Sequence, residues 1–380
     1  MLDLDFGAEQ EMLRESLRGL LADACPLGTV RALEDDPIGF APELWAQLGK
    51  LDVLGLLLPE EFGGSGMSLV EGVVLYEEFG RSLAPTPHFV SAVLGGGVLA
   101  LAGSEEQRAA FLPGIVSGET ILTAGWLEAG GGFGPRGVAM AARPDGSGGF
   151  LLSGTKRHVA FAAAASHVVV LARTGEEAEA VDLFLVPTDA PGVSISQRMT
   201  IGSDAQYDLT LADVVVGEAA RIGGPGSGWA TWNTVMHDGI ILLAAQAMGG
   251  ARQALEITVQ YAKDRHQFDK PLGAFQALAH YLADAQTTVD GGATLVHEAA
   301  WARSVGRSVE KLAPMAKLFA CQTYRDVTAM AQQVFGGIGF TLEFDIQLYF
   351  RRAKQLQISW WDDRRLEELV AATILDAKDV

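Results

Sequence analysis

Residues 332–363 read QQVFGGIGFTLEFDIQLYFRRAKQLQISWWDD, and this stretch decides how the C-terminal part of the chain folds. Apolar residues lead into it at the spacing of a helix. They are Met315, Leu318, Phe319, Ala329, Met330 and Val334. The pattern stops at Gly336-Gly337, because glycine enters the left-handed conformation of a helix C-cap without strain. A second helix then carries Tyr349 to Lys354 and reaches Trp360-Trp361, which two carboxylates follow.

Outward from this stretch, helical spacing fills the C-terminal part of the chain. We expect four long helices, which together make a bundle domain at 229–380. They lie at roughly 229–263, 275–303, 311–335 and 343–375. A linker rich in glycine and proline precedes the bundle at 223–228.

The middle of the chain alternates short β-rich runs with turns such as Pro144-Asp145-Gly146. The runs are 120–127, 137–142, 149–153, 167–172, 181–186, 193–196 and 213–216. They indicate an antiparallel β domain at 121–222, either a barrel or a sandwich. Residues 1–120 again show helical spacing. The sequence therefore predicts an α+β fold, mostly α: an N-terminal helical domain, a middle β domain and a C-terminal four-helix bundle.

Composition excludes several classes of partner. The formal net charge is −19, from 28 basic and 47 acidic residues, which argues against nucleic acid or an anionic membrane surface. Cys25 and Cys321 suit a reducing cytosol, and neither has the spacing of a metal site. We see no export signal and no apolar run long enough to cross a bilayer. We therefore expect a cytoplasmic protein without a metal.

Four motifs carry more specific information. They are LLLPEEFGGSGMS (56–68), ILTAGWLEAGGGFG (121–134), RHQFDKPLGAFQALAHYLAD (265–284) and QVFGGIGF (333–340). The third resembles R-x-x-F-G-x-x-I/L-x-x-F/H-Q of the acyl-CoA dehydrogenase family, and the fourth resembles its Q-x-x-G-G-x-G. The second stands where the family has T-E-P-x-x-G-S-D. The order of the three blocks also matches, so the resemblance covers essentially the whole chain.

The resemblance implies FAD, an acyl-CoA substrate and removal of hydrogen across the α–β bond. In the family a glutamate takes the α-proton and flavin N5 takes the β-hydride. The resemblance further implies a tetramer in which each FAD lies between two subunits, and an electron-transfer flavoprotein as the acceptor.

Seven residues match the motifs with which the family holds the pyrophosphate and adenine of a neighbour's FAD. They are Arg265, Gln267, Phe268, Gln276, Gln333, Gly336 and Gly337. Arg265 would grip the pyrophosphate, although an arginine also suits the last turn of a helix. The glycine pair suits close approach of a ligand or a plain helix end. Asp269 stands where the family usually has glycine.

The chain's own flavin pocket departs from the family pattern. Leu127 replaces the threonine that would bond the flavin ring, although Glu128 keeps the acid. His158 replaces a tryptophan that packs on the flavin, and we interpret it as structural rather than catalytic. Losing a donor to a buried flavin atom removes roughly 1–3 kcal/mol.

The catalytic base is also missing. Alignment with the family places Trp360 at the glutamate, and an indole offers only an N–H donor. Some relatives carry the glutamate on the first bundle helix, at a position that falls near Gly239. Asp238 is one residue from Gly239, and Asp362 and Asp363 are two and three residues from Trp360, but a slip of one residue turns a helical side chain by about 100°. We interpret all three as solvated carboxylates.

These departures predict a subunit that lacks catalysis of its own. Motifs for a neighbour's FAD persist, whereas those for the chain's own flavin and substrate do not. This is the pattern of the glutamate-lacking subunit in an α2β2 acyl-CoA dehydrogenase, a type known for bulky, steroid-like side-chain thioesters. Three alternatives stay open: a homotetrameric dehydrogenase with a displaced base such as Asp238 or Asp363, a flavin monooxygenase, and a partner that binds no cofactor.

Overall fold

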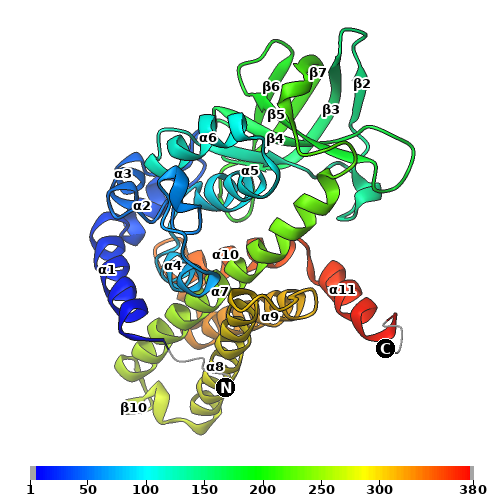
Figure 1. Ribbon diagram of the computed structural model, residues 1–380. Helices are drawn as coiled ribbons and strands as arrows, with labels where there is room; N and C mark the ends of the chain where they lie inside the picture. The colour runs from blue at the N-terminus through cyan, green and yellow to red at the C-terminus, as the bar shows by residue number, and fades with distance from the viewer. Residues whose placement is uncertain (1–5, 377–380) are drawn as a thin grey trace. The chain divides into compact units, whose positions relative to one another are not determined.

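The computed structural model describes residues 6–376, and the chain divides into two compact units (Figure 1). Unit 1 comprises Met1–Val30, Ser68–Ala84 and Ile240–Val380. Unit 2 comprises Arg31–Met67 and Pro85–Gly239. The long helix α7 (Gly228–Asp264) begins in unit 2 and continues into unit 1.

Unit 1 is helical. Its other elements are α1 (Ala8–Ala24), α4 (Leu69–Ser82), the short strands β9 (His266–Gln267) and β10 (Lys270–Pro271), α8 (Gln276–Ser304), α9 (Leu312–Phe335), α10 (Ile346–Ile358) and α11 (Asp363–Leu375). Helices α4 and α7 cross at a glycine contact. A Cβ at Gly80 would lie 1.9 Å from the Gln246 carbonyl oxygen, and a Cβ at Gly249 would lie 1.9 Å from that of Glu77. Only glycine permits backbones to approach so closely.

The expected fourth bundle helix is two helices, so that prediction was wrong. The helical pattern over 343–375 is interrupted between α10 and α11, where Trp360 and Trp361 have φ of +54° and +71°. Two successive left-handed residues cannot continue a right-handed helix. Asp362 then restarts it, because its side chain accepts a hydrogen bond from Arg365 N at the start of α11.

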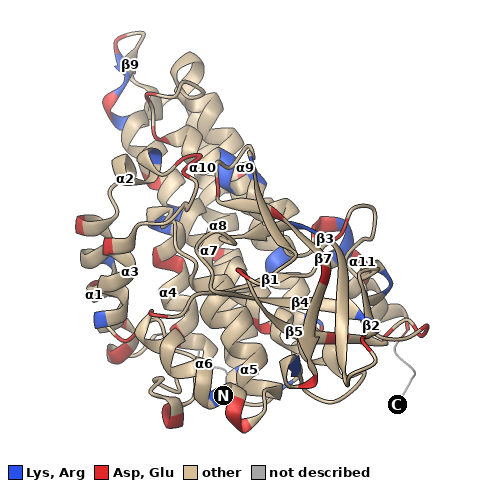
Figure 2. Ribbon diagram, turned by 90° about the horizontal axis from the view of Figure 1, so that it is seen from above, with Lys and Arg blue, Asp and Glu red and all other residues tan. Residues whose placement is uncertain are grey.

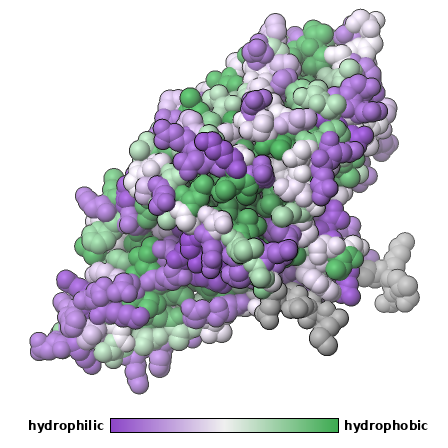
Figure 3. Space-filling model, turned by 60° about the vertical axis from the view of Figure 1, so that its left-hand side comes forward, coloured by the Kyte–Doolittle hydropathy of each residue, from purple (hydrophilic) through white to green (hydrophobic). Residues whose placement is uncertain are grey.

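The face of α9 that is most deeply buried is lined largely by small residues. Phe319 is 39% exposed, whereas Ala313, Ala316 and Ala320 are buried together with Lys317. Small residues let the neighbouring helices approach α9 closely, which outweighs the hydrophobicity of the larger side chains. Figure 3 shows hydrophobic residues, in green, that stay on the surface among hydrophilic ones.

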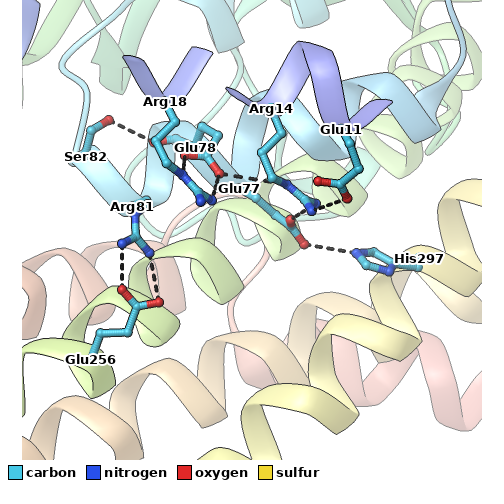
Figure 4. Close-up of polar contacts among 9 residues, drawn as sticks. All are labelled: Glu11, Arg14, Arg18, Glu77, Glu78, Arg81, Ser82, Glu256 and His297. Carbon is cyan, nitrogen blue, oxygen red and sulfur yellow. Dashed lines mark hydrogen bonds and ion pairs between the residues drawn. The ribbon is translucent and has the colours of Figure 1, made fainter. Parts of the chain in front are cut away.

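A charged network joins α1, α4 and α8 within unit 1 (Figure 4). Glu77 and Glu78 of α4 are buried, and Arg14 and Arg18 of α1 pair with them at 2.9 and 2.6 Å. His297 of α8 lies 3.0 Å from Glu77. Burial by itself would raise the pKa of the Glu77 carboxyl, but His297 and Arg14 hold that pKa below its ordinary value.

Unit 2 joins helices to one sheet. The helical elements are α3 (Pro42–Lys50), a π-helix (Phe89–Gly96), α5 (Gly97–Ala102) and α6 (Glu105–Ser117), and α2 (Leu27–Ala32) lies across the division between the units. The π-helix packs on the first strand, where Leu122 N donates to Ser91 Oγ at 3.1 Å. A Cβ at Gly95 would lie 2.8 Å from that of Leu122.

The sheet has the order β6-β7-β3-β2-β4-β5-β8, with β1 beside β4. Its strands are β1 (Leu122–Gly125), β2 (Ala141–Pro144), β3 (Gly149–Ala160), β4 (His167–Arg173), β5 (Val181–Pro187), β6 (Val193–Arg198), β7 (Gln206–Gly217) and β8 (Arg221–Ile222). Most pairs are antiparallel, as predicted, but β1 and β2 each run parallel to β4. Strands β3 and β7 are longer than predicted, because register shifts carry their pairing past Gly154 and Lys156.

Candidate functional site

The hairpin after α7 carries three of the seven predicted FAD residues. Strands β9 and β10 pair Gln267 with Lys270, and the intervening Phe268 and Asp269 have φ of +53° and +60°. This is the two-residue turn with positive φ at both positions that suits a tight hairpin. Asp269 fills the family's glycine position because aspartate tolerates a left-handed conformation. The turn leaves the Phe268 side chain 87% exposed.

Arg265 stands at the base of this hairpin. Its backbone N donates to Tyr261 O at 2.8 Å and its carbonyl accepts from Leu272 N at 2.8 Å, so the backbone is fixed at both groups. The side chain is exposed, and it forms no ion pair with any residue in the described range 6–376. Figure 2 shows basic and acidic residues side by side along the segment around β9.

The glycine pair after α9 is open to solvent. Gly336 has φ +64°, and a Cβ built at Gly336 or Gly337 would meet no atom within 4 Å. Gln333 is exposed on the last turn of α9, and Gln276 is exposed as the first residue of α8. The sequence predicted a helix end here, and the structure has one, although the backbone N–H of Gly336 is not bare because it donates to Gln332 O.

One aromatic contact brings the hairpin and the glycine pair to the same end of unit 1. The Tyr261 ring stacks on Phe335 with centroids 4.1 Å apart and planes 13° from parallel. Tyr261 lies one turn before Arg265, and Phe335 directly precedes Gly336. A guanidinium beside an uncrowded glycine pair suits a pyrophosphate, because the guanidinium presents N–H donors to anionic oxygens and glycines let a ligand approach the backbone closely.

The turn at the position of the family's glutamate is packed into the protein. Trp361 is completely buried and Trp360 is partly buried. The Nζ of Lys317, also completely buried, donates to the carbonyl oxygens of Leu356, Ser359 and Trp361 at 3.1, 2.9 and 2.8 Å. Burial lowers the pKa of Lys317, while the negative charge of Asp363 and Asp362 counteracts that shift.

Neither candidate for a displaced base is arranged as one. Asp363 Oδ2 accepts from Gln357 Nε2 at 2.7 Å, so this carboxylate ties α11 to α10. Asp238 is half-buried on α7. The adjacent position is tight for a side chain, because a Cβ at Gly239 would lie 3.2 Å from the Phe89 ring.

The polar groups of the β domain are already paired. Lys156 Nζ is completely buried and lies 2.6 Å from Glu128 Oε1, which also accepts from Met140 N at 3.0 Å. Burial lowers the pKa of Lys156 to about 8, although Glu128 opposes the shift. His158 Nδ1 lies 2.7 Å from Gln206 Oε1, which agrees with a structural histidine.

Aromatic rings fill the space beside this pair. The Trp126 ring lies 5.8 Å from Phe133 and 5.7 Å from Trp232, measured between centroids. Both Trp126 and Trp232 are buried. In the motif that would serve a flavin, Phe133 stands where the family has a serine.

Sequence reasoning missed the two lysines that are buried among residues 6–376. Lys317 shares the buried face of α9 with Ala313, Ala316 and Ala320. The signal was present, because a lysine in phase with a run of alanines at helical spacing marks a buried cation. Lys156 gave no such signal on its own strand, since its partner Glu128 lies 28 residues earlier.

Within residues 6–376, no group of three or more His, Cys, Asp or Glu side chains could hold a metal ion. Over the same range, none of the helices combines the length and apolar character that a membrane span requires.

Comparison with known proteins places this arrangement in context. Three family models match the chain: "Acyl-CoA dehydrogenase, N-terminal domain" at residues 7–119, "middle domain" at 123–214 and "C-terminal domain" at 226–371. The chain is 30% identical to the probable acyl-CoA dehydrogenase YngJ of Bacillus subtilis, covering 94% of this chain and 95% of that protein.

Two solved structures of paired subunits are similar. The ChsE4-ChsE5 complex of Mycobacterium tuberculosis matches with a TM-score of 0.91 and 27% identity over all of both chains. A variant of the Tcur3481-Tcur3483 steroid ACAD matches with a TM-score of 0.86 and 33% identity, covering 96% of this chain and 98% of that one.

Proposed function

The chain belongs to the acyl-CoA dehydrogenase family, and we propose that it is the subunit of a heteromeric enzyme that completes a partner's FAD site without supplying the base. The family consists of oxidoreductases that act on CH–CH groups and use FAD. In this role the substrate, a bulky acyl-CoA thioester, binds the partner, and an electron-transfer flavoprotein takes the electrons.

The closed turn at Trp360-Trp361 carries the proposal. A base must be a group that can accept a proton and that reaches the substrate. Trp360 provides an indole, Asp362 is occupied as the cap of α11, and Asp363 is bonded to Gln357. Each carboxylate near the turn therefore has a structural bond that proton abstraction would disturb.

The exposed end of unit 1 fits a cofactor that arrives with another subunit. Arg265, Gln267, Gln276 and Gln333 offer N–H donors, and no Cβ occupies the space in front of Gly336 and Gly337. When bound, FAD supplies the hydride acceptor of the reaction. The residues of this chain would hold its pyrophosphate and adenosine, which lie away from the reacting ring.

The chain's own β domain fits a flavin less well. Trp126, Phe133 and Trp232 pack against one another, and Glu128 is engaged by Lys156. A flavin ring in this unit would need either the aromatic cluster or the buried ion pair to move. Breaking a buried pair by removing one partner typically costs about 3–5 kcal/mol.

Similar structures support the heteromeric form. Two similar solved structures bear the names of two proteins each, and one of them is described as a steroid ACAD. In a heterodimer in which one subunit binds no substrate, the acyl group bound by the other subunit has more room. That geometry suits a bulky substrate.

Purification of the chain alone and with a homologous subunit that retains the glutamate tests the proposal. We expect colourless protein alone, and a flavoprotein absorbing near ~450 nm that oxidises acyl-CoA after co-expression. Arg265→Met should lower the flavin content of the complex. Arg364→Met, which removes an equally accessible cation on α11, should leave it unchanged.

Three outcomes would contradict the proposal. Yellow protein that oxidises acyl-CoA alone would indicate a homotetramer with a displaced base. Flavin with oxygen consumption and no acyl-CoA oxidation would indicate a monooxygenase. A complex that stays colourless would indicate a partner without a cofactor role.

A further inference from the structure

The turn between α10 and α11 adopts a conformation that its sequence disfavours. Trp360 and Trp361 both lie in the left-handed region, with φ of +54° and +71°. For residues other than glycine this costs roughly 1–2 kcal/mol each by steric contact of Cβ with the following carbonyl. Such a conformation persists only where the surroundings hold it.

Lys317 is placed to hold it. Its three ammonium hydrogens match three carbonyl acceptors: Leu356 in the last turn of α10, Ser359 before Trp360, and Trp361 after it. The bonds to Ser359 and Trp361 therefore bracket Trp360 from both sides. The bonds to Leu356 and Ser359 also satisfy carbonyl groups that the end of α10 leaves without helical partners.

The charge of Lys317 is balanced where it lies. The C-terminal end of α10 presents partial negative charge, and Asp362 and Asp363 lie in the segment that follows. A neutral side chain of the same length would fill the space but would remove the Lys317 donor from all three carbonyls, of which Leu356 O would keep a contact with Cys321 Sγ at 3.7 Å.

We propose that Lys317 is a positioning residue that locks the Trp360-Trp361 turn, and that it thereby fixes the backbone at the position where the family carries its glutamate. The lock consists of the lysine and the three carbonyls, not of the indole rings. The functional meaning of this position rests on the proposed function. The three hydrogen bonds of Lys317 belong to the chain itself and can be tested on the full-length chain alone.

Hydrogen–deuterium exchange on the full-length chain tests the lock. Informative amides flank the turn: Ser359 N donates to Gln355 O at 3.0 Å, and Leu366 N donates to Asp362 O at 3.0 Å. In Lys317→Met we expect exchange at these amides to accelerate at least tenfold, while α8 and α4 keep their protection. Lys156→Met, which removes the other completely buried lysine, should leave these amides unchanged.

A second variant keeps the test decisive if Lys317→Met does not fold. Trp360→Asn removes the indole but retains a residue that tolerates positive φ. We expect the flanking amides to stay protected, because the lysine and all three carbonyls remain. Loosening of the turn in Trp360→Asn, or unchanged exchange in folded Lys317→Met, would overturn the lock. Neither result depends on flavin content, so failure here is separate from failure of the heteromeric function.

Discussion

Phe268→Ala should weaken the retention of FAD in the complex without changing the stability of the lone chain. The Phe268 side chain is 87% exposed at the tip of the hairpin, so its removal takes almost no buried surface from the folded chain. In the complex the same ring would become a wall of the cofactor site. Burying a phenylalanine side chain contributes roughly 1.5–3 kcal/mol. At 1.4 kcal/mol per factor of ten, that corresponds to roughly 10- to 100-fold weaker binding.

The assay is flavin release from the co-expressed complex, followed by fluorescence during dilution, together with urea unfolding of the chain alone. Phe335→Ala provides the matched control, because Phe335 is 7% exposed and stacks on Tyr261. This control should lose roughly 3–5 kcal/mol of unfolding free energy in the chain alone. If Phe268→Ala releases flavin at the wild-type rate, the hairpin does not reach a cofactor and the assignment of this end of unit 1 fails.

Three further predictions concern unit 1. Gly249→Ala should destabilise the chain by roughly 1–3 kcal/mol in urea, because the new Cβ would lie 1.9 Å from a backbone oxygen of α4. Gly291→Ala, with no atom within 4 Å of its Cβ, should instead stabilise it by roughly 0.5–1 kcal/mol. The pKa of Glu77 is depressed from 4.5, so its stabilising contribution is present above pH 4.5 and is lost as pH falls through the lowered value; His297→Ala should reduce that loss in acid unfolding. Trp361→Gly should cost roughly 2–4 kcal/mol, because the loss of a buried indole exceeds the relief of one left-handed residue; an unchanged urea midpoint would contradict it.

Local patterns in the sequence located most helices because their signals are local. Ser68 and Ser104 cap α4 and α6, and Gly336 ends α9, as residue chemistry predicts. The break at Trp360 was not predictable in this way. Tryptophan has no preference for positive φ, and the group that stabilises the turn, Lys317, lies on another helix.

The candidate site also has features that are encoded locally and features that depend on distant residues. The exposure of Arg265 and Phe268 follows from a short hairpin, and a two-residue turn is encoded locally. Their role toward FAD stays a prediction that the release assay must decide. The pairing of Glu128 with Lys156 joins two strands, and the burial that gives it meaning depends on the whole β domain.

Packing also distinguishes a chain that has lost its catalytic base from one that carries the base at another position. The family offers two places for the glutamate, and in this chain each is closed by a different means. At Gly239 a Cβ would lie 3.2 Å from the Phe89 ring, so an acid there would crowd an aromatic side chain. At Trp360 the backbone is bracketed by two bonds to Lys317, and the next residue fills the core. A single substitution to glutamate would therefore place a carboxylate in a crowded or strained position at either site. A chain that merely moved its base would need only one of these positions closed, and the closure of both favours a subunit that leaves proton abstraction to its partner.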